Sequence, residues 1–326
     1  MLGIDVSKRN LQCALRDAAT RSVLWDKEVP NGTAGFKVLL RETPPDIAWV
    51  VEATGRYGQD LVRAARAAGR LVHLASPRKA KRFLQSQQER AKTDKIDSRG
   101  LSLFGLACPL PEYPLKEAHV EQLDQLLSAR RLLSHTISRF QQQQSELSHT
   151  TAVTATSITA MQADLKALDK QIATLTKSTP SFAGAVELDA VPGIGPVTAA
   201  MVQSRLVSKQ FDNYDQFVAY CGLDVGVRES GQRKGKTGLT KQGDAELRRL
   251  LYLAAQANLR CKSSPFKDQY QRELLKGLSR KSALCAVARK LAKVCWSIQK
   301  RGTKYDASLV GAKPTPREGD TAQPET

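Results

Sequence analysis

Four carboxylates in three separated segments of this 326-residue chain have the types and spacing that divalent-metal chemistry requires. Asp5 interrupts the apolar alternation of LGIDVS, so it places a charge in the middle of a predicted buried strand. Glu52 directly follows the apolar run IAWVV, at the carboxyl end of a second predicted strand, where open α/β sheets place their ligands. Asp94 and Asp97 lie three residues apart, so on a helix they share one face.

Carboxylates that come from separate segments can hold two divalent ions about 3.5 to 4 Å apart, which activate an attacking oxygen and stabilise a leaving oxygen in phosphodiester chemistry. Ligands that are all oxygen favour Mg²⁺ or Mn²⁺ over zinc. The four histidines and six cysteines show neither metal-ligand spacing nor a CxxC pair, so no zinc site or disulfide framework is indicated. Each carboxylate also fits a structural role: a turn cap for Asp5, an ion pair with Arg56 for Glu52, and pairs with Lys92, Lys95 or Arg99 for the helical aspartates.

The elements that must position these carboxylates occupy residues 1–115. Short apolar runs predict strands at residues 2–7, 11–17, 22–29, 47–51 and 70–76, and helices at 57–68 and 77–87. Three strands in succession, followed by alternating strands and helices, predict a mixed α/β sheet with an antiparallel edge. This is also the element order of a ribonuclease-H-like sheet.

Residues 116–180 change to a helical repeat in which apolar residues recur at alternating steps of three and four. The repeat is typical of a coiled-coil seam, and two such helices predict a helical hairpin or a dimerisation arm. An ordinary intramolecular helix pair stays open as the alternative. Residues 181–305 are predicted to be almost wholly helical apart from a Gly-rich loop between Gly222 and Gly243, and residues 306–326 are predicted to be a disordered tail.

The composition favours a polyanionic partner. The 50 Lys and Arg residues against 32 Asp and Glu give a formal net charge of +18, which favours nucleic acid over an anionic membrane surface. No uninterrupted apolar run approaches the ~20 residues that are needed to cross a bilayer. We therefore expect a cytoplasmic protein associated with the nucleoid.

The motifs GIDVSK, VEATGRYG and KTDKIDSRGLS, together with VPGIGPVTAA, FVAYCGLDV and RESGQRKGKTGLTKQGDAELRRLLYLAA, resemble the DEDD transposases of the insertion sequence one-ten family, recombinases guided by a bridge RNA. The resemblance covers nearly the whole chain except the tail. It implies a RuvC-like metal-binding domain in which Asp5, Glu52, Asp94 and Asp97 are the ligands of Mg²⁺ or Mn²⁺.

The resemblance also implies a serine nucleophile, and the matching position is Ser230 within RESG. From the residues alone, a plain turn serine fits this Gly-rich segment better. The basic neighbours would neutralise a phosphate there, and they are Arg228, Arg233, Lys234 and Lys236.

Two further segments are candidates for contacts with nucleic acid. VPGIG resembles a helix-hairpin-helix turn, in which backbone N–H groups, here near Gly193 and Gly195, hold a phosphate; a structural helix connection stays open. Residues 274–305 contain no Asp or Glu, and the helix predicted there carries Arg289, Lys290 and Lys293.

Taken together, the chain is predicted to be a transposase that cuts and rejoins donor and target double-stranded DNA, guided by a bridge RNA. A dimer or tetramer is expected, because four strands must be exchanged between two duplexes. One alternative is a RuvC-like Holliday-junction nuclease that cuts with activated water, and another is a non-catalytic nucleic-acid-binding protein.

Overall fold

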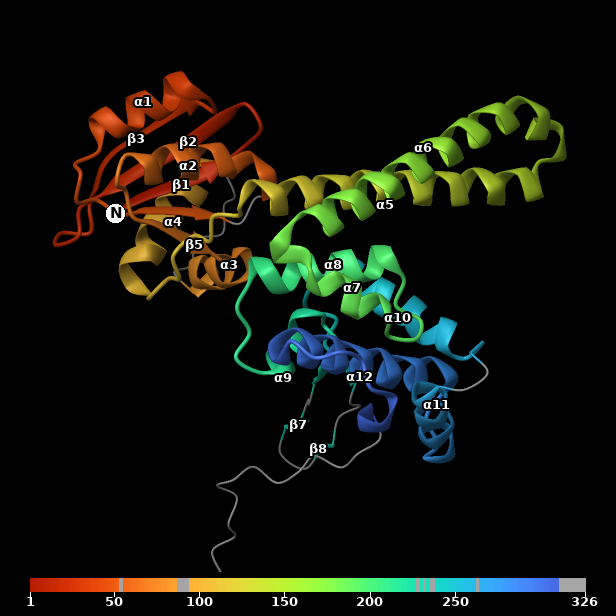
Figure 1. Ribbon diagram of the computed structural model, residues 1–326. Helices are drawn as coiled ribbons and strands as arrows, with labels where there is room; N and C mark the ends of the chain where they lie inside the picture. The colour runs from red at the N-terminus through yellow and green to blue at the C-terminus, as the bar shows by residue number, and fades with distance from the viewer. Residues whose placement is uncertain are drawn as a thin grey trace, which may run out of the picture. The chain divides into compact units, whose positions relative to one another are not determined.

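The computed structural model describes residues 1–52, 55–86, 94–226, 229–230, 233–234, 238–261 and 264–310 (Figure 1). The chain divides into two compact units, Met1–Lys116 and Glu117–Thr326. Residues 311–326 of the predicted tail lie outside the described residues. Immediately before them Ala307–Val310 form a short 3-10 helix with Val310 buried, so ordered chain continues past residue 306.

Unit 1 is built on a five-stranded mixed sheet. Its strands are β1 (Leu2–Val6), β2 (Asn10–Arg16), β3 (Val23–Pro30), β4 (Trp49–Glu52) and β5 (Val72–Ala75). Their order is β3-β2-β1-β4-β5, in which β1, β2 and β3 pair antiparallel and β1, β4 and β5 pair parallel. The prediction of a mixed α/β sheet with an antiparallel edge and a ribonuclease-H-like strand order is confirmed.

Helices cover both faces of this sheet (Figure 1). They are α1 (Thr33–Glu42), α2 (Gln59–Ala67), α3 (Pro77–Ser86) and α4 (Asp94–Ala107), with a 3-10 turn at Gly55–Gly58. One face buries Ile4 and Val51 in a core with Leu39 of α1 and Leu61 of α2. The other face buries Val50 and Ala75 against α3 and α4.

The sequence did not predict α1, and the reason lies at its start. Its N-cap is Gly32, which gives no side-chain cap, and its first turn carries no acidic residue. A Ser, Thr, Asp or Asn cap and an early carboxylate are the usual signals of a helix start, and both are missing.

Helix α4 packs directly on β1 because Gly3 has no side chain. A Cβ at Gly3 would lie 2.2 Å from the Ser98 carbonyl oxygen and 2.4 Å from the Ser102 nitrogen, both backbone atoms of α4. Backbone atoms cannot rotate away, so any side chain at this position would push the helix off the strand. The small residue therefore sets how closely the helix that carries Asp97 approaches the strand that carries Asp5.

A Gly3→Ala substitution should therefore destabilise unit 1 by about 2–3 kcal/mol, the cost of overpacking a fixed contact. The matched control is Gly32→Ala, because a Cβ at Gly32 would meet no atom within 4 Å, and we expect it to cost about 0.5 kcal/mol or less. Urea unfolding of the two variants measures the difference, and equal midpoints would refute the close-approach account.

Unit 2 is mainly helical. Its helices are α5 (Ala118–Glu146), α6 (Thr151–Ser178), α7 (Gly184–Asp189), α8 (Pro196–Ser208), α9 (Tyr214–Tyr220), α10 (Ala245–Asn258), α11 (Pro265–Leu275) and α12 (Arg280–Arg301), with 3-10 turns at Ser148–Thr150 and Pro180–Phe182. Two small strand pairs interrupt them: β6 (Val225–Gly226) with β9 (Gly238–Leu239), and β7 (Glu229–Ser230) with β8 (Arg233–Lys234). In the described part of the chain, no helix is long and apolar enough to cross a membrane.

The long helices α5 and α6 pack against each other as a hairpin (Figure 1). Near their ends at the body of unit 2, Leu123, Leu127 and Ile172 are buried in the same core as α8, α10 and α12. Farther out Arg130 of α5 pairs with Asp169 of α6, N to O distance 2.5 Å. The helical repeat of residues 116–180 thus forms a hairpin within one chain whose base belongs to the core of unit 2.

Candidate functional site

Asp5 and Glu52 are neighbours across the two central strands of unit 1. β1 and β4 are parallel, with Gly3 beside Val50 and Ile4 beside Val51, so the next step of the register places Asp5 beside Glu52. Neighbouring residues of a parallel pair project from the same face of the sheet. Both side chains are half-buried, and both have interaction partners in the structure.

The first turn of α4, which carries Asp97, lies on the same face of the sheet. Position 105, near the end of this helix, lies against Val50 and Met1, and its middle lies against Gly3. Because Gly3 and Asp5 are two residues apart on one strand, they share a face. Toward its N-terminus, α4 therefore continues past Gly3 to the level of Asp5. Its first turn begins at Asp94 and contains the half-buried Asp97.

The side chains of Asp5, Glu52 and Asp97 fit a divalent metal by their chemistry. The donors are all carboxylate oxygens, as Mg²⁺ and Mn²⁺ require. Gln12 of β2 is paired in register with Asp5, is 6% exposed, and its Nε2 finds no hydrogen-bond partner among the described residues. Within those residues, which leave out the side chain of Asp94, no three carboxylate, histidine or cysteine groups are gathered closely enough to hold an ion.

Gln12 is a residue of this site that the sequence analysis missed. It is a polar side chain inside the apolar strand NLQCALR, the same signal that singled out Asp5 in β1. A buried donor without a partner is costly, and a ligand oxygen or an ordered water beside Asp5 would satisfy it.

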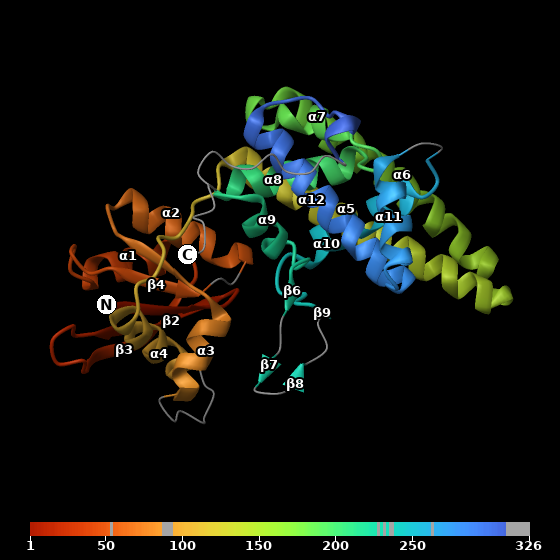
Figure 2. The same ribbon diagram turned by 90° about the horizontal axis from the view of Figure 1, so that it is seen from below.

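Ser230, in unit 2, lies in β7. Its backbone is paired with Arg233 of β8, and Glu229 is paired with Lys234 (Figure 2). The side chains of these four residues lie outside the described part of the chain, as do Arg228 and Lys236 altogether.

The chain segments that enter and leave this region are held by contacts to their backbone carbonyls. Gly243 must approach Tyr220, since a Cβ at Gly243 would lie 2.1 Å from the Tyr220 carbonyl oxygen. Asp244 donates its backbone N–H to the same oxygen at 2.8 Å. Arg248 of α10 donates to the Cys221 carbonyl at 3.1 Å, and Nε of Arg289 donates to the Leu223 carbonyl at 3.0 Å. We call residues 220–226 and 238–244 the loop foot.

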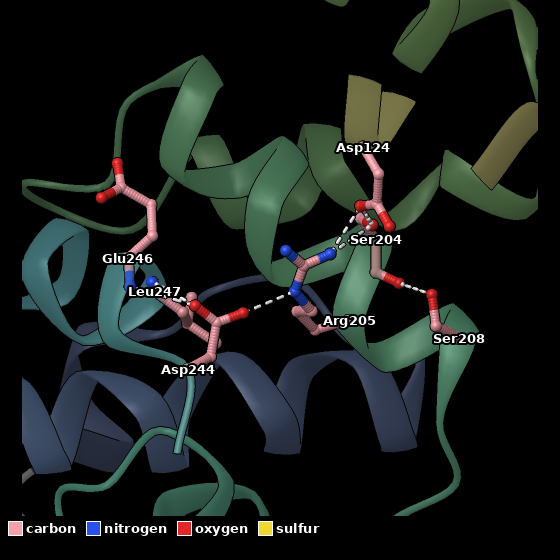
Figure 3. A network of polar contacts seen from close by, with 7 residues as sticks. All are labelled: Asp124, Ser204, Arg205, Ser208, Asp244, Glu246 and Leu247. Atoms are coloured by element: carbon pink, nitrogen blue, oxygen red, sulfur yellow. Dashed lines mark hydrogen bonds and ion pairs between the residues drawn. The ribbon is translucent and has the colours of Figure 1, made fainter. Parts of the chain in front are cut away.

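A buried arginine ties the loop foot to the base of the helical hairpin (Figure 3). Arg205 of α8 donates from Nε to Asp244 at 2.7 Å and from one terminal nitrogen to Asp124 of α5 at 2.5 Å. Ser204 also donates to Asp124, at 2.7 Å. The same Asp244 carboxylate caps α10 by accepting the backbone N–H of Leu247 at 3.0 Å.

These contacts shift the acidity of Asp244. Burial acts to raise the pKa of Asp244, but the hydrogen bonds from Leu247 and Arg205 and the arginine charge outweigh it and hold the pKa below its ordinary value. The carboxylate is therefore ionised at neutral pH. Sequence analysis predicted a helix from residue 244 but missed this pairing, because Arg205 lies 39 residues from Asp244 and 81 residues from Asp124 along the chain.

The VPGIG turn connects α7 to α8, and its two glycines have different surroundings. Gly193 has a φ of 79° and packs against α10, since a Cβ there would lie 2.4 Å from the Ala254 carbonyl oxygen. Gly195 is the N-cap of α8, and a Cβ there would meet no atom within 4 Å. Gly193 thus fits a structural connection, and Gly195 lies at an accessible helix start.

The three basic candidates on α12 have described side chains. Besides its bond to the loop foot, Arg289 lines a pocket together with Lys290 and Lys293. Lys293 pairs with Asp215 at 3.1 Å and lies 4.1 Å from the centre of the Tyr214 ring. Burial and the nearby Lys293 and Arg272 charges lower the pKa of Lys290.

Two family models match most of the chain. Residues 2–152, which include the three elements β1, β4 and α4 that carry the four carboxylates, match the DEDD transposase model of IS110 elements. Residues 185–271, which include β7 with Ser230, match the model described as Transposase IS116/IS110/IS902 family. The chain belongs to the IS110 family of transposases. It is therefore a DNA recombinase, and a non-catalytic binding protein is excluded.

Curated relatives agree with this assignment. The transposase is similar to the pilin gene-inverting protein of Moraxella lacunata, 25% identical over 94% of this chain and 98% of that one. It is 30% identical to a probable family 20 transposase of Pseudomonas aeruginosa over 44% of each chain. Among solved structures, Thermus thermophilus RuvC in complex with a Holliday junction substrate matches 35% of this chain and 100% of its own, with 16% identity and a TM-score of 0.28.

Proposed function

We propose that this transposase recombines DNA with Mg²⁺ held by Asp5, Glu52, Asp94 and Asp97, with Ser230 as the nucleophile, and with a bridge RNA to select its sites. The observation that supports the proposal is the parallel register of β1 and β4, which sets Asp5 beside Glu52 on the sheet face that α4 covers. A cation held beside Asp5 and Glu52 would account for charged side chains at half-buried positions.

The carboxylates of Asp5, Glu52, Asp94 and Asp97 would hold the cation. A bound divalent cation supplies Lewis-acid stabilisation of the charge that develops on a phosphodiester. Gln12, beside Asp5, orients that carboxylate or an ordered water from the neighbouring strand. Gly3 keeps α4 close enough for its first turn to take part.

The serine step exchanges one phosphoester bond for another. The Ser230 hydroxyl gives up its proton as its oxygen bonds to phosphorus, while the bond from phosphorus to a sugar oxygen breaks. The sugar oxygen takes up one proton and leaves as a hydroxyl, so the step consumes no net proton. The phosphoserine link retains the bond for rejoining to a second strand, so no nucleotide hydrolysis is needed. The resemblance supports Ser230 as this residue, and its place on the hairpin between β6 and β9 supports access for a DNA strand.

Guidance and assembly complete the proposal. RNA guidance is supported by the resemblance to bridge-RNA-guided recombinases, and the +18 net charge suits a protein that binds several polyanionic strands. A dimer or tetramer is proposed because two duplexes are cut and joined, with the α5–α6 hairpin as the contact between copies. Light scattering of the DNA- and RNA-bound protein tests the assembly, and a monomer there would overturn it.

The experiment that tests the function is a denaturing gel for protein covalently joined to DNA. The wild type, incubated with supercoiled DNA, the flanking RNA of its element and Mg²⁺, should give an adduct that Ser230→Ala lacks. The expected loss is complete within detection, about 10³-fold or more, since the nucleophile itself is removed.

The matched control is Ser157→Ala, which removes an exposed serine hydroxyl from α6 and should leave the adduct unchanged. Nicked DNA without an adduct in both wild type and Ser230→Ala would instead establish a hydrolytic nuclease of the junction-resolving kind and overturn the serine mechanism.

A further inference from the structure

A pocket of about 870 Å³ lies between the loop foot and helices α10, α11 and α12. Its wall includes Val225 of β6 and Leu239 of β9, the strand pair from which the Ser230 hairpin extends. The pocket is therefore lined in part by the strands that lead into and out of the hairpin that carries Ser230.

The charge lining this pocket is almost all positive. One acidic residue, Glu273, faces it, and this carboxylate pairs with Lys276 at 3.1 Å. Five cations line the pocket, and Lys293 among them is paired with Asp215 at 3.1 Å. They are Lys241, Lys281, Arg289, Lys290 and Lys293. Like charges gathered in this way destabilise one another until an anion neutralises them.

Two of these cations are held in unfavourable surroundings. Burial and neighbouring cations lower the pKa of Lys290. Lys241 is held at a φ of 53°, in the left-handed region that is strained for a non-glycine residue, and Arg248 donates to its carbonyl at 3.3 Å. Strain and charge repulsion at the same pocket are typical of a binding site.

The remaining lining suits nucleotide bases. Tyr252 of α10 presents a half-buried ring, and Leu239 and Leu278 add apolar surface. Aromatic rings beside a basic groove are the usual platform for unpaired bases. The volume of about 870 Å³ is that of a site for a small ligand, so it admits a few nucleotides of one strand and not a double helix.

We infer that this pocket binds an unpaired segment of the DNA strand that the transposase cuts, with the lysines on its phosphates and Tyr252 against a base. The inference rests on the proposed function, because the choice of DNA follows from the pocket's position at the foot of the Ser230 hairpin. It adds a substrate subsite that requires the duplex to be opened before or during cleavage.

Cys285 provides a reporter inside the pocket. Its thiol lines the pocket and is half-buried, and burial raises its pKa. Cys108 is equally half-exposed but belongs to unit 1, so it serves as the reference thiol in the same molecule. The rate of maleimide modification at each cysteine, followed by peptide mass spectrometry at pH 8, reports occupancy without any substitution.

Single-stranded DNA of about 12 nucleotides, within the size range of single-strand sites, should protect Cys285 and not Cys108. At tenfold above its Kd the modification rate should fall about tenfold, because roughly a tenth of the sites stay empty. A duplex of the same sequence and the matching RNA should leave the rate at Cys285 unchanged. Absence of protection by single-stranded DNA, or equal protection by RNA or duplex, would overturn the inference.

The charge contacts are tested by Lys281→Gln combined with Lys290→Gln. The Kd for single-stranded DNA is measured from Cys285 protection at several salt concentrations. Losing two phosphate contacts should lower the slope of log Kd against log salt concentration by about 1.4. The matched control is Lys166→Gln combined with Lys170→Gln, two exposed lysines of α6, which should leave the slope unchanged. Equal slopes for the two double variants would refute the role of the pocket lysines.

The adduct assay separates this inference from the proposed function. Covalent adduct without protection of Cys285 refutes the pocket inference and leaves the serine mechanism standing. Protection of Cys285 without any adduct in the wild type refutes the serine mechanism while supporting the pocket as a strand-binding site.

Discussion

Replacing Asp5 with asparagine is expected to abolish metal-dependent DNA cleavage while unit 1 stays folded. Asparagine keeps the shape of the side chain in β1 but removes the charge that we propose binds a cation beside Glu52. A bound metal ion contributes several kcal/mol of charge stabilisation in the transition state, so losing the ion should lower the rate about 10³-fold or more. A time course of nicking of labelled supercoiled DNA in Mg²⁺ measures it.

Asp60→Asn is the control for this substitution. This substitution also replaces aspartate with asparagine, but on the exposed side of α2, where Asp60 pairs with Arg63 at 3.1 Å. Exposed ion pairs of this kind contribute about 0–1 kcal/mol. Both variants should unfold at the wild-type temperature within a few degrees. A folded Asp5→Asn protein that nicks DNA within tenfold of the wild-type rate would remove Asp5 from the metal site.

Arg205→Met is expected to have the largest effect on the stability of unit 2. The substitution leaves Asp124 and Asp244 largely buried, with side chains 17% and 15% exposed, and without the guanidinium that neutralises them (Figure 3). Breaking a buried ion pair from one side costs about 3–5 kcal/mol. Urea unfolding at pH 7 measures the loss.

The pH dependence of that loss has a definite sign. The folded protein holds the pKa of Asp244 below its ordinary value, so its ionised form stabilises the fold above about pH 4, and this stabilisation is lost as the pH falls through the folded pKa. The difference between wild type and Arg205→Met should therefore shrink below about pH 4.

The matched control is Arg130→Met on the helical hairpin. Its partner Asp169 is 39% exposed, so water solvates the carboxylate that remains and the cost should be about 1 kcal/mol or less. Similar losses for the two arginine variants, or a difference that does not change in acid, would contradict the assigned role of Arg205.

The sequence singled out the carboxylates of the candidate site because their signals are local. A charge inside an apolar strand singles out Asp5, and a charge at the end of IAWVV singles out Glu52. Their proximity was not predictable in the same way, because it depends on the parallel register of β1 and β4, which are joined by two other strands and a helix in sequence. Gln12 joins the site through the antiparallel register on the other side of β1.

The interactions of unit 2 were harder to predict because they form between distant segments. Arg205 gives no signal within α8, and its partners come from α5 and from the residue before α10. Arg289 was predicted only as a contact for nucleic acid, but it also holds the carbonyl of Leu223 in the loop foot. Side chains that bridge elements are visible only once the helices are packed.

The most direct test of the account is to identify the residue that carries DNA after cleavage. Wild-type transposase and Asp5→Asn are each incubated with DNA, RNA and Mg²⁺, digested with nuclease and protease, and analysed by peptide mass spectrometry. The account predicts a nucleotide joined through phosphate to Ser230 in the wild type and none in Asp5→Asn. Cleaved DNA with an unmodified Ser230 peptide, or a nucleotide on any other residue, would contradict it.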